Sequence, residues 1–216
     1  MGPIRPLLGA GVIAGPLYVG VGLIEGLARP GFDFTKHDLS ILANGDWGWV
    51  HSTLLVVTGV LTIAGAAGLR RALRGGMGAT WGPPLLGLYG LGLVGAGFFS
   101  ADPAYGFPPG TPADYHTVSW HGALHLVCGA IGFLGLIAAC FVVARRFGGS
   151  GQGGWAVASR VIGAFYLLAF LGIAAGSQQG GVIGTTVILG FSAAVVLGWT
   201  WITVTCVRAV SLNRDI

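Results

Sequence analysis

The sequence has 216 residues, of which 54% are hydrophobic and only 8% are charged, so it cannot cover a water-soluble surface of this size. The mean hydropathy of +0.80 instead indicates that lipid is the solvent for most of the chain. The net charge of +4 would suit a nucleic-acid partner, but the positions of the basic residues explain this charge by membrane topology, as described below.

Six stretches of the sequence are long and apolar enough to cross a membrane, which takes about 20 residues of α-helix. In chain order they are residues 7–28, 48–69, 80–101, 117–144, 156–176 and 182–207. No convincing cleavage site follows the first stretch, which is therefore interpreted as a retained helix and not as a signal peptide. Many of the 41 glycines lie inside these stretches, where small residues allow close helix packing. We predict a single all-α domain over residues 1–216, a bundle of six transmembrane helices.

Six spans place both termini on the same side of the membrane, and the basic residues indicate which side. Nine of the 11 lysines and arginines fall at the helix ends on the side of the termini, and only Arg29 and Lys36 fall at the opposite ends. This bias predicts cytoplasmic termini in a plasma membrane, with membrane lipids and no nucleic acid as partners. The acidic residues other than Asp215, and all five histidines, are predicted to lie at the helix ends on the outer side of the membrane. Ionisable groups are thus concentrated there.

Two connections on the outer side, residues 29–47 and 102–116, are long enough to contribute to a site. In the first, Asp38 precedes Ser40 by two residues and could either cap a short interfacial helix or face the site as part of a lid. The second is rich in proline in its first part, which favours a stiff connector over the alternative, the roof of a pocket.

The strongest local feature is His121-Gly-Ala-Leu-His125, near the outer end of the fourth span. Helix geometry places residues i and i+4 on one face, so both imidazoles can point at one site. His51 opens the second span, while Glu25 and Asp102 close the first and third. Imidazole and carboxylate suit either zinc or acid/base catalysis. The candidate metal ligands are His51, Asp102, His121 and His125, and the candidate catalytic residues are Asp102, His121, His125 and Glu25. The alternative is structural, with histidines that hydrogen-bond between helices.

Several segments of the sequence resemble small bacterial multipass proteins catalogued as a domain of unknown function. They are residues 29–33 (RPGFD), 37–40 (HDLS), 99–103 (FSADP), 110–112 (GTP), 121–125 (HGALH) and 144–147 (ARRF). This resemblance covers most of the chain and implies a six-helix inner-membrane protein, without an activity. More loosely, the four candidate metal ligands are similar to those of the membrane hydrolases that include alkaline ceramidases and adiponectin-type receptors, which hold zinc. This sequence departs from those hydrolases in three respects: they have seven core helices, they carry HxxxH on the last helix, and their site lies on the inner side of the membrane.

The leading hypothesis for the function is a membrane-embedded enzyme that acts on a lipid-like or isoprenoid substrate from the outer leaflet, with a divalent metal such as zinc as a possible cofactor. A second hypothesis uses carboxylates alone, with Glu25 or Asp102 kept protonated by an apolar setting to protonate an alkene, as a terpene cyclase requires. The non-enzymatic alternatives are haem or quinone binding through histidines, and lipid binding or transport.

Overall fold

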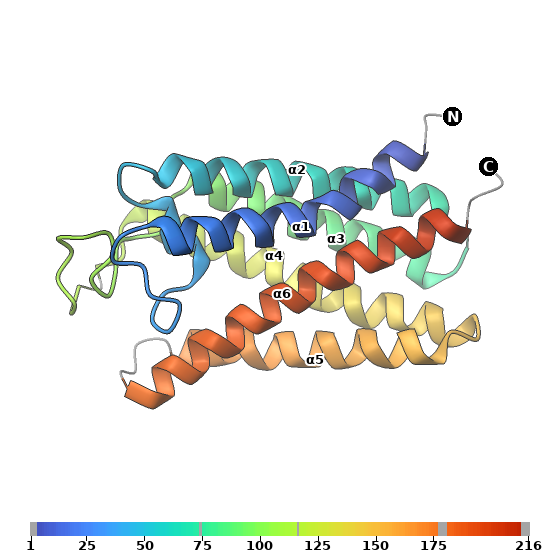
Figure 1. Cartoon of the computed structure of the whole chain (residues 1–216). Helices are drawn as coiled ribbons and strands as arrows, with labels where there is room; N and C mark the ends of the chain where they lie inside the picture. Colours follow the sequence, from blue (N-terminus) through green and yellow to red (C-terminus); the bar gives the residue numbers. More distant parts are fainter. Residues whose placement is uncertain (1–3, 74, 116, 177–180, 213–216) are drawn as a thin grey trace.

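The computed structural model describes residues 4–73, 75–115, 117–176 and 181–212, and within these ranges the chain forms six α-helices and one short 3₁₀ helix (Figure 1). The α-helices are α1 (Ile4–Ala28), α2 (Gly48–Ala72), α3 (Met77–Phe98), α4 (Trp120–Gly149), α5 (Gly153–Gly176) and α6 (Gly181–Leu212), and the 3₁₀ helix is η1 (Leu39–Ala43). Each α-helix contains most of one predicted span. Four of the residues that the sequence assigns to one side of the membrane lie outside the described residues: Arg74, His116, Arg214 and Asp215.

The helices confirm the membrane class of the protein. Five of the six that the structure describes are long and apolar enough to cross a membrane. The exception is α3, in which glycines and the pair Pro83-Pro84 dilute the large apolar side chains. Within the described ranges no strand forms, and the only β-type pairing there is an isolated bridge between Ala104 and Phe107. The fold is therefore all-α.

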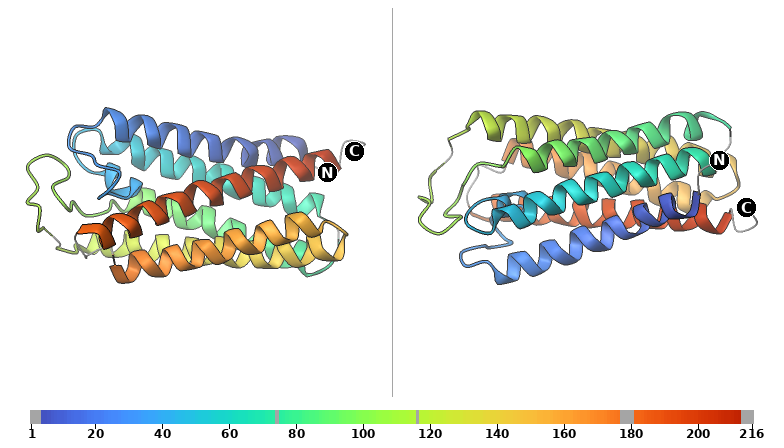
Figure 2. Two further views of the ribbon diagram at one scale, coloured as in Figure 1. Left: turned by 60° about the horizontal axis from the view of Figure 1, so that its bottom comes forward. Right: turned by 90° about the horizontal axis from the view of Figure 1, so that it is seen from above.

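The helices form a closed ring in which each packs against the next in sequence and α6 returns to α1. The start of α1 and the end of α6 lie at one end of the bundle, the termini end, and the two long loops lie at the other, the loop end (Figure 1). α6 crosses the bundle obliquely, beside α1 at the termini end and away from α1 toward the loop end (Figures 1 and 2). The ring is therefore wider at the loop end.

Glycines allow the first three helices to approach closely. A Cβ atom on Gly65 of α2 would lie 2.7 Å from the Cα atom of Gly11 in α1, and a Cβ atom on Gly90 of α3 would lie 2.7 Å from the carbonyl oxygen of Gly59 in α2. These separations are too short for any side chain. The glycines within the spans thus serve helix packing, as the sequence predicts.

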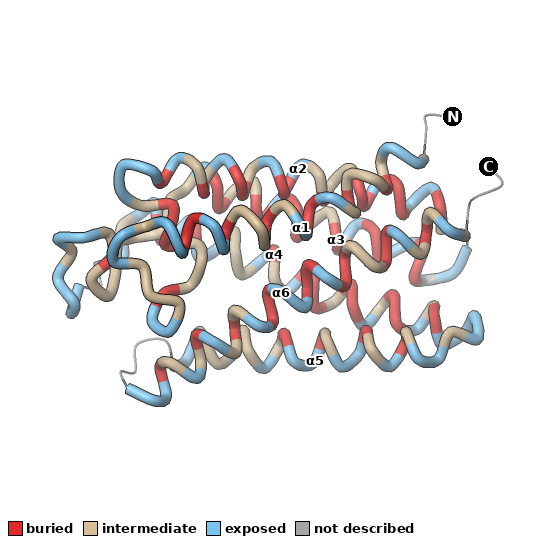
Figure 3. The backbone as a smooth tube through the Cα atoms, in the orientation of Figure 1, coloured by how far each residue is buried: buried red, intermediate tan, exposed pale blue. Residues whose placement is uncertain are grey.

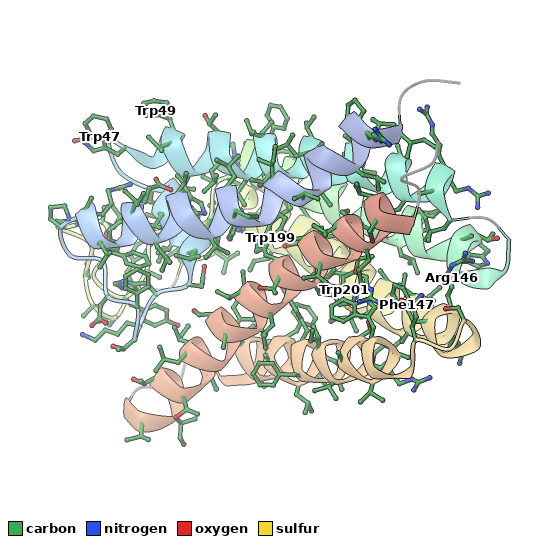
Figure 4. The ribbon with its side chains drawn as sticks, turned by 45° about the vertical axis from the view of Figure 1, so that its right-hand side comes forward. Trp47, Trp49, Arg146, Phe147, Trp199 and Trp201 are labelled. Carbon is green, nitrogen blue, oxygen red and sulfur yellow. The ribbon has the colours of Figure 1, made fainter. Side chains whose placement is uncertain are left out.

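Burial separates the inside of the ring from its outer surface (Figure 3). Trp199 and Trp201 on α6 are each 1% exposed, and the indole N–H of Trp201 donates to Ser159 Oγ at 2.9 Å (Figure 4). On the outside of α5, Leu168 and Leu171 are exposed. An apolar outer surface together with a packed aromatic interior is typical of a bundle that faces lipid.

Candidate functional site

Arg29 fixes the two long loops to each other at the loop end. Its guanidinium donates hydrogen bonds to the carbonyl oxygens of Leu42 at 3.1 Å and Asn44 at 2.6 Å. The same guanidinium lies over the ring of Phe107, a fully buried residue of the second loop, 5.2 Å from the ring centroid. Because one cation contacts both loops, the first loop is held in place above the helices.

His37 also joins the two loops, through both ring nitrogens. Its Nδ1 atom accepts the backbone N–H of Asp33 at 2.9 Å, so the proton resides on Nε2, which donates to the carbonyl oxygen of Tyr105 at 3.1 Å. Hydrogen bonds from the hydroxyl and the backbone N–H of Thr35 lower the pKa of the neighbouring Asp33 carboxyl. His37 therefore connects the two loops through hydrogen bonds and has a structural role.

A cavity of about 560 Å³, the loop-end cavity, lies beneath these loops. Residues 36–41 and 101–105 form its roof, including Asp38, which caps η1 by accepting the backbone N–H of Ser40 at 3.0 Å. Asp38 thus caps a short helix, as the first of its two predicted alternatives states, and it also lines the cavity. The second loop also roofs a pocket, the alternative that its proline content favoured less than a stiff connector.

Every helix contributes an apolar or aromatic side chain to the walls of the loop-end cavity: Tyr18, Leu55, Tyr89, Phe133, Phe170 and Phe191, in order from α1 to α6. Ring contacts hold this lining together. The rings of Tyr18 and Tyr89 lie 4.9 Å and 5.4 Å from the ring of the buried Trp199, measured between centroids. The cavity is therefore a preformed apolar chamber in which aromatic rings from five helices form part of the wall.

His125 presents one ring nitrogen to α3 and keeps the other available. Its Nδ1 atom lies 3.0 Å from the carbonyl oxygen of Ala96 and 2.8 Å from that of Phe99, so Nδ1 carries the proton and donates to the C-terminal end of α3. In the neutral ring, Nε2 is then a hydrogen-bond acceptor. Since His125 lines the cavity and is only 7% exposed, this acceptor belongs to a secluded site.

Asp102, which follows α3, accepts a hydrogen bond from the start of α4. Its Oδ2 atom accepts the backbone N–H of Ser119 at 2.8 Å, while Ser119 Oγ accepts the N–H of Gly122 at 3.1 Å. A carboxylate is favoured at a helix N-terminus by the helix dipole. The carboxylate lies so close to Gly122 that a Cβ atom there would overlap it. Ser119 as the N-cap also explains why α4 begins at residue 120 and not at 117.

Glu25 and His51 form a buried pair between α1 and α2. His51 Nδ1 lies 2.9 Å from Glu25 Oε2, and the two residues are 0% and 8% exposed. The second atom of each group, His51 Nε2 and Glu25 Oε1, is buried without a hydrogen-bond partner. Neither residue lines the loop-end cavity, but the ring of Tyr18, which does, meets the His51 ring edge-on at 6.0 Å between centroids.

His121 stands apart from the predicted cluster. It is exposed, and its ring lies against that of Trp120, 3.5 Å away between centroids. Of the five candidate residues, the structure thus joins Glu25 to His51 and places Asp102 and His125 on the loop-end cavity. Across the residues that the structure describes, no three His, Cys, Asp or Glu side chains are grouped to hold a metal. The zinc hypothesis therefore has no support.

Comparison with known proteins identifies the family but not an activity. Residues 12–208 match the sequence profile of the protein of unknown function family DUF998. The chain belongs to the DUF998 family. No curated protein and no solved structure matches this DUF998 chain, and the looser likeness to ceramidase-type hydrolases is unsupported.

The aromatic lining of the cavity is the part of the site that sequence reasoning missed. In this DUF998 chain, Tyr18, Tyr89, Phe133 and Phe191 lie within uniformly apolar stretches, so no polar neighbour or periodic pattern distinguishes them from other core residues. Only the three-dimensional divergence of α6 from α1 reveals that they surround a cavity.

Proposed function

We propose that this protein binds an amphiphilic molecule, lipid-like or isoprenoid, in the loop-end cavity. The observation that carries the proposal is a chamber of about 560 Å³ with apolar walls from all six helices, aromatic in five of them, and polar groups concentrated near its roof. Pockets for small molecules generally have volumes of about 300–1,000 Å³ and combine apolar walls with a few polar groups that orient the ligand. The apolar part of the ligand would lie among Tyr89, Phe133 and Phe191.

The polar end of the ligand would be a hydrogen-bond donor, such as a hydroxyl group. His125 supports this assignment because its Nδ1–H is committed to α3, which leaves Nε2 as an acceptor. The nearby carboxylates already have partners: Asp102 accepts from Ser119 and Asp38 accepts from Ser40. A long-chain or isoprenoid alcohol, or a quinol, has the required combination of donor and apolar body.

A cavity-filling substitution tests the proposal. A Cβ atom on Gly129, which lines the cavity, would make only an ordinary contact of 3.8 Å with Phe133, so Gly129→Leu places a side chain in the cavity without displacing backbone. We expect this variant to bind a radiolabelled long-chain alcohol at least about tenfold more weakly than the wild type. The control is Gly20→Leu, where an added Cβ atom meets open space outside the cavity. Equal affinity in both variants would contradict the proposal.

A second candidate function is acid/base catalysis on the bound amphiphile. It is favoured by the presence of His125 and Asp102 in the lining of one cavity, where a substrate could contact both. Nε2 of His125 would act as the base, and the roof would exclude water. The carboxylate-driven cyclase has less support. Glu25 is paired with His51 and does not line the cavity, and Asp102, which does line it, is engaged as an acceptor for the backbone N–H of Ser119. No feature of the described residues specifically favours haem binding or transport.

We further propose six membrane spans with both termini in the cytoplasm of a bacterial cell. α3 has no charged residue and packs between α2 and α4 within the ring, which supports its inclusion as a span. The start of α1 and the end of α6 share one end of the bundle, as an even number of spans requires (Figure 1). The excess of arginine at that end supports its cytoplasmic location.

Cysteine labelling in intact cells tests this topology. Asp46 at the loop end and Gly154 at the termini end are both exposed, and two of the native cysteines, Cys140 and Cys206, are buried. A membrane-impermeant maleimide should label Asp46→Cys in intact cells and Gly154→Cys only after the cells are opened. The wild type gives the background from its own cysteines. The reverse pattern would place the termini outside.

A further inference from the structure

A second hollow lies at the termini end, on the opposite side of the protein from the loop-end cavity. Its volume is about 400 Å³, and it lies between the start of α3 and the end of α4. We call it the arginine hollow; its lining consists of Gly76, Gly78, Arg145, Arg146, Gly149 and Ser150. Because it shares no residue with the loop-end cavity, any ligand here is independent of the function proposed above.

Arg146, which lies at the termini end of the bundle (Figure 4), lines this hollow and is held there by two contacts. Its Nη1 atom donates to the carbonyl oxygen of Gly75 at 2.6 Å, and its aliphatic stem lies against Gly78, where a Cβ atom would come within 2.5 Å of that stem. Gly78 thus lets the arginine stem lie directly on α3. A guanidinium that is positioned in advance loses little conformational entropy when it binds an anion.

Positive charge dominates this part of the protein. Arg145 is exposed beside Arg146, and Arg70 of α2 donates from Nη1 to the carbonyl oxygen of Ala79, one residue beyond Gly78, at 2.6 Å. Three guanidinium groups therefore surround the start of α3. Among the residues that the structure describes, no Asp or Glu lies at the termini end. The hollow is thus suited to a multiply hydrogen-bonding anion.

We propose that the arginine hollow binds the phosphate group of an anionic phospholipid. Guanidinium groups match the geometry of phosphate oxygens, and basic hollows between membrane helices are suited to anionic lipid headgroups. The membrane favours a lipid over free phosphate as the source of this group. Trp81 on α3, one turn from Gly78 toward the middle of the bundle, is 59% exposed and offers its ring to the acyl chains of a lipid held in the hollow.

The test compares two arginines at the same end of the bundle. Arg145 lines the hollow, whereas Arg160 on α5 is also exposed but does not line it. Purified protein in zwitterionic nanodiscs is titrated with phosphatidylglycerol, and bound lipid is counted by native mass spectrometry. We expect Arg145→Gln to weaken phosphatidylglycerol binding about tenfold, the loss of a charged hydrogen bond, and Arg160→Gln to leave it unchanged.

Three results would overturn the proposal. Equal losses in Arg145→Gln and Arg160→Gln would show that general charge attracts the lipid. Unchanged binding in Arg145→Gln would show that the lipid binds elsewhere. Displacement of phosphatidylglycerol by inorganic phosphate at low millimolar concentration would assign the hollow to a soluble anion.

Discussion

Replacing either Glu25 or His51 alone with leucine is expected to lower the free energy of unfolding by about 1–5 kcal/mol, and replacing both is expected to restore most of that loss. Each single substitution leaves the remaining partner buried between α1 and α2 without its 2.9 Å hydrogen bond. Breaking a buried ion pair costs about 3–5 kcal/mol, and orphaning a neutral partner costs about 1–3 kcal/mol. The double substitution removes both polar groups, including the two atoms that already lack a partner.

A double-mutant cycle measured by reversible unfolding in mixed detergent micelles would quantify this coupling. The control is Thr53→Leu, two residues from His51 on an exposed part of α2, for which we expect a change within about 0.5 kcal/mol. Losses that simply add in the double variant would show that the two residues stabilise the bundle independently. The size of the single losses also reports whether the pair is charged, which bears on acid/base hypotheses for Glu25.

Two substitutions should separate the contact of His125 with α3 from its proposed role in ligand binding. His125→Leu removes both the donor to the α3 carbonyl oxygens and the acceptor in the cavity, so it should lower the free energy of unfolding by about 1–3 kcal/mol and weaken ligand binding. His125→Asn keeps an N–H donor near the position of Nδ1 and removes Nε2. We expect this variant to fold nearly as stably as the wild type but to bind a long-chain alcohol about tenfold more weakly, a difference of about 1.4 kcal/mol.

Thermal unfolding with and without the alcohol, followed by direct binding measurements, checks both roles of His125. The same His125→Asn variant tests the catalytic alternative, because an enzyme that uses Nε2 as its base would also lose product formation from a bound substrate. Binding by His125→Asn that equals wild-type binding would show that the polar end of the ligand lies elsewhere in the cavity.

The long apolar helices were predictable from sequence because hydropathy and helix length are local properties. A stretch of about 20 apolar residues identifies a spanning helix whatever its neighbours are. Helix ends were less predictable, since they depend on caps such as Ser119, whose hydroxyl oxygen accepts the N–H of Gly122 and starts α4 three residues later than hydropathy suggests. Asp38 was recognised as a cap because its partner, Ser40, is only two residues away.

The grouping of the polar residues was not predictable, because it depends on how each helix is rotated in the ring. Glu25, His51 and His125 all lie near the loop-end termini of their helices, yet two of them pair with each other while the third contacts α3. His121 and His125 share a helical face by spacing, but His121 is exposed against Trp120 while His125 is buried. Helices that are apolar on all sides carry no periodic signal that would fix these rotations.

Photo-crosslinking tests most directly whether the loop-end cavity holds an amphiphile. Protein in native membranes is incubated with a long-chain alcohol that carries a diazirine in its apolar part, and labelled residues are located by peptide mass spectrometry. We expect saturable labelling at cavity residues such as Phe133 and Phe191, suppressed by unlabelled alcohol. Labelling confined to lipid-facing residues such as Leu168 and Leu171, without saturation, would contradict it.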